Sequence, residues 1–185
     1  ASASQLDRGR LQEALGAKAA ELFDCFAESA RPGLSEAWAS AARNLLARDF
    51  AFALLGRREA AKIAKVLEAW GVRVVLDPMA GTGLHAALLA QEGLRVLATD
   101  ARPGSTSGLC WHDVQLWYMD DEAGLPKVDT NSSALFLSWP PRNAAAEIAL
   151  RRFRGQILIV IGDRGQWHGS AGFHKAVEDG WSLVL

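Results

Sequence analysis

A carboxylate and two glycines follow a short apolar run in the middle of the chain. The β-branched run Val72–Leu76 leads into Asp77-Pro78-Met79-Ala80-Gly81-Thr82-Gly83. Glycine has no Cβ, so the backbone at Gly81 and Gly83 can bend sharply and approach a ligand closely. If the run is a strand of a parallel sheet, the turn lies at the edge where such sheets bind ligands. The turn is therefore predicted to bind a cofactor.

Two classes of cofactor use a turn of this kind. A dinucleotide places its pyrophosphate on the start of the following helix and favours the spacing GxGxxG; Ala86 stands at the third glycine position, which that spacing permits. S-adenosylmethionine (SAM) carries no phosphate but has an ammonium group, which suits the carboxylate of Asp77. Asp100, at the end of the next apolar run, suits a ribose diol in either class. The carboxylate at the turn favours SAM.

The same residues resemble a known superfamily. Leu76–Gly83 followed by a helix, with Ala98-Thr99-Asp100 ending the next strand, resembles motifs I and II of class I SAM-dependent methyltransferases. The DPMAGTG form is similar to a DPxxGxG variant found in enzymes that methylate amino nitrogens, including guanine-N2 RNA methylases. The resemblance covers roughly residues 72–185. It implies that Asp100 holds the ribose, that Ala101 lies beside the adenine, and that the other cofactor contacts are Asp77, Met79, Ala80, Gly81 and Gly83.

Ser138-Trp139-Pro140-Pro141 follows a later strand and is similar to the [DNS]PP[YFW] motif of amino-directed methyltransferases. Prolines remove N–H donors and stiffen the loop, so carbonyls and a polar side chain can face an acceptor. Ser138, Trp139 and Pro140 are therefore candidate catalytic residues, and Pro141 a candidate substrate contact. The chain departs from the motif, because Trp139 takes the polar position and Arg142 the aromatic one. Alternatively, Trp139 caps the core and the prolines only end a strand. The closest likeness is to small, uncharacterised methyltransferase-like proteins.

Other polar residues fall in predicted loops near the same edge. His112 is a candidate general base because its reference pKa is near neutral, although a surface histidine beside a buried tryptophan is the simpler interpretation. Trp111 and Asp163 are candidate acceptor contacts, and Asp163 alternatively caps a turn. His168 and His174 lie six residues apart with no carboxylate or thiolate pattern beside them, so no metal site is predicted.

The elements that must position these residues alternate between strand and helix. Strands are predicted over 72–76, 94–99, 114–119, 134–138, 157–161 and 181–185, and helices over 84–91, 144–153 and 172–179. The pattern predicts an α/β, Rossmann-like fold with an open, mostly parallel sheet and helices on both faces. Residues 1–70 read as an all-helical segment, with helices over 6–30, 35–46 and 57–70, which is predicted to form a lid or a dimer face. Residues 71–185 form the SAM-binding domain.

Composition narrows the class of partner. The chain has 185 residues, half of them hydrophobic, with a formal net charge of -1, so broad attraction to nucleic acid is not indicated. Two cysteines far apart favour reduced thiols, and neither a membrane span nor a signal peptide is visible, so a cytoplasmic location is expected. The prediction is a SAM-dependent methyltransferase with a small-molecule acceptor. An RNA or DNA amino-methyltransferase, a non-catalytic binding protein and a nicotinamide dehydrogenase stay open as alternatives.

Overall fold

The computed structural model describes residues 50–53, 55–104, 110–118, 124–163 and 167–183. The two helices predicted over 6–30 and 35–46 lie outside these ranges. The third begins and ends close to its prediction, as α3 (Arg57–Ala69).

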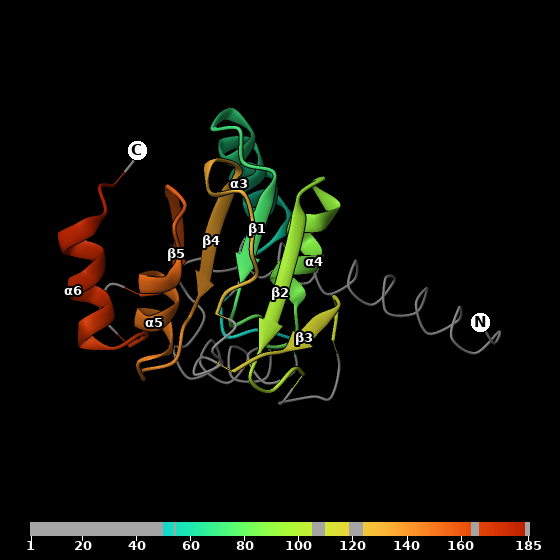
Figure 1. Ribbon diagram of the computed structural model, residues 1–185. Coiled ribbons are helices and arrows are strands. Elements are labelled where there is room, and N and C mark those ends of the chain that lie inside the picture. The colour runs from blue at the N-terminus through green and yellow to red at the C-terminus, as the bar shows by residue number, and fades with distance from the viewer. Residues whose placement is uncertain (1–49, 54, 105–109, 119–123, 164–166, 184–185) are drawn as a thin grey trace, which may run out of the picture.

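Five parallel strands form one sheet in the order β3-β2-β1-β4-β5. They are β1 (Val74–Asp77), β2 (Arg95–Asp100), β3 (Val114–Leu116), β4 (Ser133–Ser138) and β5 (Ile157–Ile161). The chain adds strands on one side of β1 and then crosses to the other side, where β4 pairs with β1 in parallel (Figure 1). The predicted α/β, Rossmann-like fold is confirmed.

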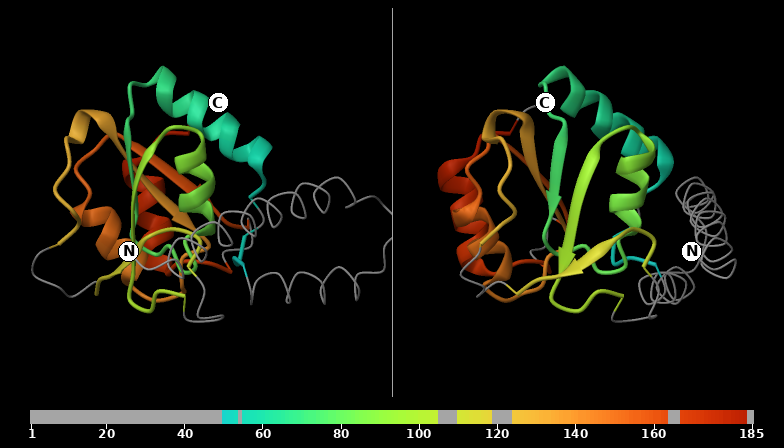
Figure 2. Two further views of the ribbon diagram at one scale, coloured as in Figure 1. Left: turned by 90° about the vertical axis from the view of Figure 1, so that its right-hand side faces the viewer. Right: turned by 45° about the vertical axis from the view of Figure 1, so that its right-hand side comes forward.

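Helices cover both faces of the sheet. α3 and α4 (Leu84–Gln91) pack on one face, while α5 (Ala145–Arg152) and α6 (Ala171–Gly180) pack on the other (Figure 2). A 3-10 turn, Thr130–Ser132, leads into β4. None of the helices that the structure describes is long and apolar enough to cross a membrane.

The interior strand β4 explains why the sequence shows continuous apolar runs. Ala134 and Phe136 pack with the α3 and α4 side, whereas Leu135 and Leu137 pack with the α5 and α6 side, and all four are fully buried. Side chains alternate between the faces of a strand, so a strand covered by helices on both faces must be apolar at every position.

The chain leaves the predicted pattern in three places. Residues 181–183 are not in a strand: Trp181 instead stacks on Phe153, with ring centroids 6.3 Å apart, and so becomes partly buried without joining the sheet. β1 begins two residues later than predicted, because the N–H of Val72 still donates to a carbonyl of α3. β3 ends at Leu116, after which Trp117 turns into the core.

Phe136 tests the burial argument. We expect Phe136→Ala to lower the free energy of unfolding by about 3–5 kcal/mol, because it leaves a cavity in a core that cannot close fully. Val66→Ala, on the outer face of α3 where the side chain is 56% exposed, should change it by less than about 0.5 kcal/mol. Urea unfolding of both variants measures the difference, and equal losses would contradict the placement of β4 in the interior of the sheet.

Candidate functional site

The chain adds β2 and β3 on one side of β1 and then β4 and β5 on the other side. This reversal of strand order between β1 and β4 places two polar residues side by side. Asp77 is the last residue of β1, and Ser138 is the last residue of the neighbouring strand β4. In an open parallel sheet, the crevice outside the carboxyl ends at such a switch point is where ligands bind. The predicted cofactor turn and the Pro-Pro turn therefore meet at one edge.

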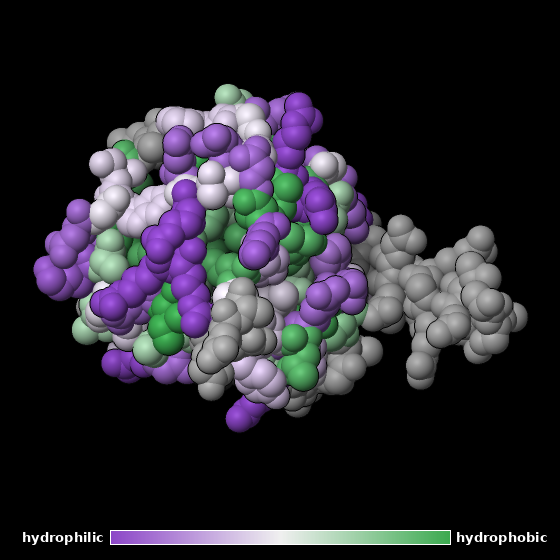
Figure 3. All heavy atoms as spheres, in the orientation of Figure 1, coloured by the Kyte–Doolittle hydropathy of each residue, from purple (hydrophilic) through white to green (hydrophobic). Residues whose placement is uncertain are grey.

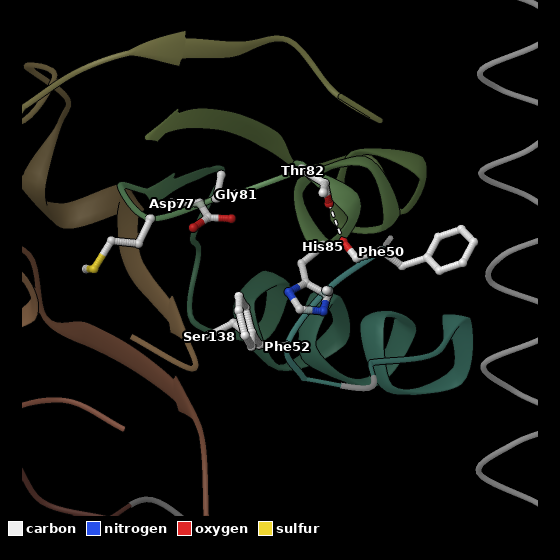
Figure 4. Close-up of a pocket in the computed structure, with 10 residues that line it drawn as sticks. Phe50, Phe52, Asp77, Gly81, Thr82, His85 and Ser138 are labelled. Atoms are coloured by element: carbon white, nitrogen blue, oxygen red, sulfur yellow. Dashed lines mark hydrogen bonds between the residues drawn. The ribbon is translucent and has the colours of Figure 1, made fainter. Parts of the chain in front are cut away.

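A small cavity lies at this point. It measures about 70 Å³ and is lined by Phe50, Ala51, Phe52, Asp77, Met79, Ala80, Gly81, Thr82, His85 and Ser138. Figure 4 shows the carboxylate of Asp77, the ring of His85 and the ring of Phe52 coming together from β1, α4 and the segment before α3. Oδ1 of Asp77 and Oγ of Ser138 are buried and have no hydrogen-bond partner. Buried polar atoms are normally paired, so these two mark a place for a polar ligand group.

The environment of Asp77 is unusual for a carboxylic acid. The residue is only 2% exposed, and burial raises its pKa from the ordinary 3.8 to about 8. A hydrogen bond from the backbone of Met79 opposes this shift, and the nearby negative charge of Asp100 adds to it. At neutral pH the group holds its proton, and a cation placed beside Oδ1 would favour its ionised form.

Asp100 supports the glycine turn. Its Oδ2 accepts a hydrogen bond from the N–H of Gly81 at 2.8 Å, and its Oδ1 accepts one from the N–H of Arg102 at 2.7 Å. Gly81 has a φ of 57°, a conformation that favours glycine, and a Cβ added there would meet nothing within 4 Å. The side chain predicted to hold a ribose therefore fixes the turn, and its remaining lone pairs are left for a ligand.

Gly83, in contrast, is covered by the chain itself. A Cβ on Gly83 would lie 2.6 Å from Cγ2 of Val114 and 3.0 Å from Cβ of His112, so the first turn of α4 is packed against the segment that leads into β3. The N–H of Trp111 donates to the carbonyl of Thr82 at 2.7 Å, while Nε2 of His112 lies 3.4 Å from the carbonyl of Val96. Trp111 and His112 thus pack behind the turn and do not line the cavity; neither does Ala101, which is exposed.

Residues 50–53, here called the strap, close the other side of the cavity. The hydroxyl of Thr82 donates to the carbonyl of Phe50, and Nε2 of His85 donates to the carbonyl of Ala53 at 3.2 Å. Burial lowers the pKa of His85 to about 4, so its ring is neutral at physiological pH. The ring of Phe50 points away from the cavity (Figure 4). It stacks on the ring of Trp111, with the ring centroids 5.6 Å apart. Nothing in the residue types of the strap signalled this contact.

The Pro-Pro turn is held from the neighbouring strand. Trp139 has a φ of 47°, and its N–H donates to the carbonyl of Ile161 at 2.7 Å. The carbonyl of Pro140 accepts from the N–H of Gly169 at 2.8 Å, and Pro141 is exposed. A positive φ in a bulky residue is strained, and such strain is found most often at functional sites. Only Ser138 of this turn lines the cavity.

Asp163 belongs to a group of residues that the sequence did not bring together. Its Oδ1 accepts from the N–H of Trp167 at 2.9 Å and lies 3.1 Å from Nδ1 of His168. The ring of His168 lies 5.9 Å from that of Trp139. The position of Asp163 at a strand end was the available signal, but the i, i+5 separation from His168 matches no regular element.

No known protein family matches the chain, and neither the curated proteins nor the solved structures contain a significant match. The function must therefore be inferred from the geometry of the site itself.

The pKa of Asp77 predicts how stability depends on pH. The folded state keeps a proton that the unfolded state loses, so the free energy of unfolding should fall as pH rises from about 4 to about 8 and then level off. Asp77→Asn has no proton to lose, so its free energy of unfolding should not fall in this way. Its free energy of unfolding relative to that of the parent chain should therefore rise between about pH 4 and about pH 8, by the order of a few kcal/mol. Asp179→Asn, at an exposed carboxylate, should show no such growth. Urea titrations at several pH values measure both.

The strap predicts a second effect. Thr82→Val keeps the shape of the side chain but removes the hydroxyl that holds Phe50. We expect faster amide hydrogen exchange within residues 51–53, because one of the two hydrogen bonds to the strap is lost. Thr99→Val is the matched control, since the buried hydroxyl of Thr99 has no partner and its removal frees nothing. Equal exchange in both variants would count against a strap held by Thr82.

Proposed function

We propose that this protein is a SAM-dependent methyltransferase that binds the amino-acid end of SAM beside Asp77. The proposal is supported mainly by two unpartnered polar atoms, Asp77 Oδ1 and Ser138 Oγ, which belong to residues that line one cavity at the switch point of the sheet. An ammonium group suits the carboxylate and a carboxylate suits the hydroxyl, and the amino-acid part of SAM carries both groups.

A dinucleotide fits the turn less well. Its pyrophosphate would need the free N–H groups at the start of α4, but Gly83 is in contact with Val114 and His112 there. The packing of Val114 and His112 on Gly83 therefore favours SAM over a nicotinamide cofactor.

The residues of the chain would mainly bind and orient. Asp77 and Ser138 would fix the amino-acid end, Gly81 would allow close approach of the backbone, and Asp100 would keep the turn in place. When bound, SAM supplies a methyl group that its sulfonium has already activated, so alignment and exclusion of water are the main tasks of the protein.

The size of the cavity sets a condition on this proposal. Ligand pockets usually measure about 300–1,000 Å³, whereas the space at Asp77 is about 70 Å³. One end of the cofactor fits there, and the remainder would lie outside the cavity or in place of the strap. The same observation favours a second candidate, a methyltransferase-like protein that binds a nucleoside without turnover.

Calorimetry with SAM and S-adenosylhomocysteine tests the proposal. We expect micromolar-range binding, and release of a proton at neutral pH because the bound ammonium favours ionised Asp77. Asp77→Asn should weaken binding of SAM by about tenfold or more, since a charge-assisted hydrogen bond is replaced by a neutral one. 5′-Methylthioadenosine lacks the ammonium, so its affinity should be equal in both proteins.

Two further outcomes bear on the proposal. Asp100→Ala should also weaken SAM binding, because the turn loses its support at Gly81 and Arg102. If the parent chain ignores SAM and S-adenosylhomocysteine but is stabilised by NAD, the proposal is wrong.

A further inference from the structure

The carboxyl ends of β4 and β5 carry a second group of side chains, next to the cavity but separate from it. It consists of Trp139 and Arg142, which follow β4, and Asp163, Trp167 and His168, which follow β5. The two strands are neighbours, and Ser138 pairs with Ile161 in their register. Trp139 is therefore the residue that joins this group to the cavity, since Ser138 lines the cavity directly before it.

His168 is held in one orientation from several sides. Its Nδ1 lies 3.1 Å from Oδ1 of Asp163, so the N–H at Nδ1 is donated to the carboxylate and Nε2 keeps its lone pair. The side chain is only 6% exposed. A Cβ added at Gly162 would lie 2.2 Å from the ring, so only glycine leaves room for it there. The ring also packs edge-on against Phe173 and His174.

Trp139 carries the strain that brings this group beside the cavity. Its left-handed backbone turns the chain at the end of β4 and sets its ring 5.9 Å from that of His168. A tryptophan in this conformation is strained, so the surrounding hydrogen bonds must enforce it. The bond from its N–H to Ile161, and that from Gly169 to Pro140, do so.

A flat aromatic surface lies beside the buried pair. Trp167 is 68% exposed, which is unusual for the largest apolar side chain. The guanidinium of Arg142 lies 5.8 Å from the centroid of its ring. Arg142 stands where the related motif has an aromatic residue. The ring of Trp167, from the connection between β5 and α6, lies next to it. An aromatic face beside a cation suits a flat ligand that carries negative charge.

We infer that these residues form the acceptor site, that His168 takes the proton of the acceptor, and that the acceptor is a phenol with an anionic substituent. The inference rests on the proposed function. The phenolic oxygen forms a bond to the methyl carbon while the carbon–sulfur bond breaks, and the electron pair of that bond passes to sulfur. The phenolic proton goes to Nε2 of His168 and then to solvent. Asp163 is a positioning residue, because it acts through the imidazole.

Chemistry and charge select a phenol. General-base removal of a proton by an imidazole is easier from a phenolic hydroxyl, whose reference pKa is about 10, than from an alkyl hydroxyl, which is far less acidic. An amine acceptor would arrive as a cation and meet the charge of Arg142. An anionic substituent on the ring meets the same charge favourably.

Two phenols of similar shape make the test. 4-Hydroxybenzoate keeps its phenolic proton at mildly alkaline pH, whereas 4-nitrophenol is largely ionised there and needs no base. Methyl transfer from labelled SAM to each is measured for the parent chain, His168→Gln, Trp167→Leu and the control His174→Gln. His174 packs on the same group, but its Nε2 donates to the carbonyl of His168 and is not placed to act as a base. Calorimetry measures the binding of 4-hydroxybenzoate to each protein without cofactor.

We expect His168→Gln to lower kcat for 4-hydroxybenzoate by about 100-fold or more, in line with the loss of a general base. With 4-nitrophenol the same variant should stay within about threefold of the parent chain. Trp167→Leu should weaken binding of 4-hydroxybenzoate and raise its KM by about tenfold, with kcat little changed. In His174→Gln the amide nitrogen can still donate to the carbonyl of His168, so this variant should stay within about threefold of the parent chain, and SAM should bind all four proteins equally.

Three results would overturn the inference. One is a parent chain that binds SAM but methylates neither phenol, which leaves the proposed function standing. Another is an equal loss with both phenols in His168→Gln, which would mean a structural role. The third is binding of 4-hydroxybenzoate that Trp167→Leu does not weaken. If the parent chain binds no SAM, the proposed function is wrong instead. Binding of 4-hydroxybenzoate to the parent chain and to Trp167→Leu then tests the aromatic surface alone.

Discussion

The site depends on a carboxylic acid that has been placed out of contact with water. Asp77 ends the central strand of a parallel sheet, so helices cover both faces around it and little solvent reaches the carboxyl group. A charged carboxylate without a partner is costly in such a place, and the group responds by holding its proton. A cationic ligand would reverse this balance. The burial that destabilises the charge would thus make the position selective for a cation.

The turn beyond Asp77 is held in place by hydrogen bonds and packing within the protein. Asp100 accepts two backbone N–H groups, one of them from Gly81, and the segment around His112 packs on Gly83. Two glycines in one turn therefore serve different purposes: one leaves open space above the backbone, and the other allows two segments to pack closely. The strap completes the enclosure through Thr82. The face drawn in Figure 3 mixes charged and apolar residues, with no broad area of one kind.

The two ends of the candidate site are joined by a single bend. Ser138 faces the cavity, and the next residue, Trp139, turns in a strained conformation toward the imidazole of His168. A small change at this bend would move both groups, because β4 and β5 are paired from Ala134 to Ser138, up to the bend itself. Such coupling is useful where two reactants must be aligned within fractions of an ångström.

The sequence by itself determined the fold class and singled out the glycine turn as a candidate cofactor site. Apolar runs of strand length, separated by helical periodicity, predicted the order of elements. The residues from Asp77 to Gly83 stood out because a carboxylate and two glycines directly follow one of these runs. Only the tertiary structure decided which polar residues come together. His112, predicted near the site, packs behind it, while His168 approaches Asp163 through a connection with no periodic pattern. Periodicity records which face of an element is buried, but contacts between loops depend on how strands are ordered and aligned, and no local pattern encodes that order.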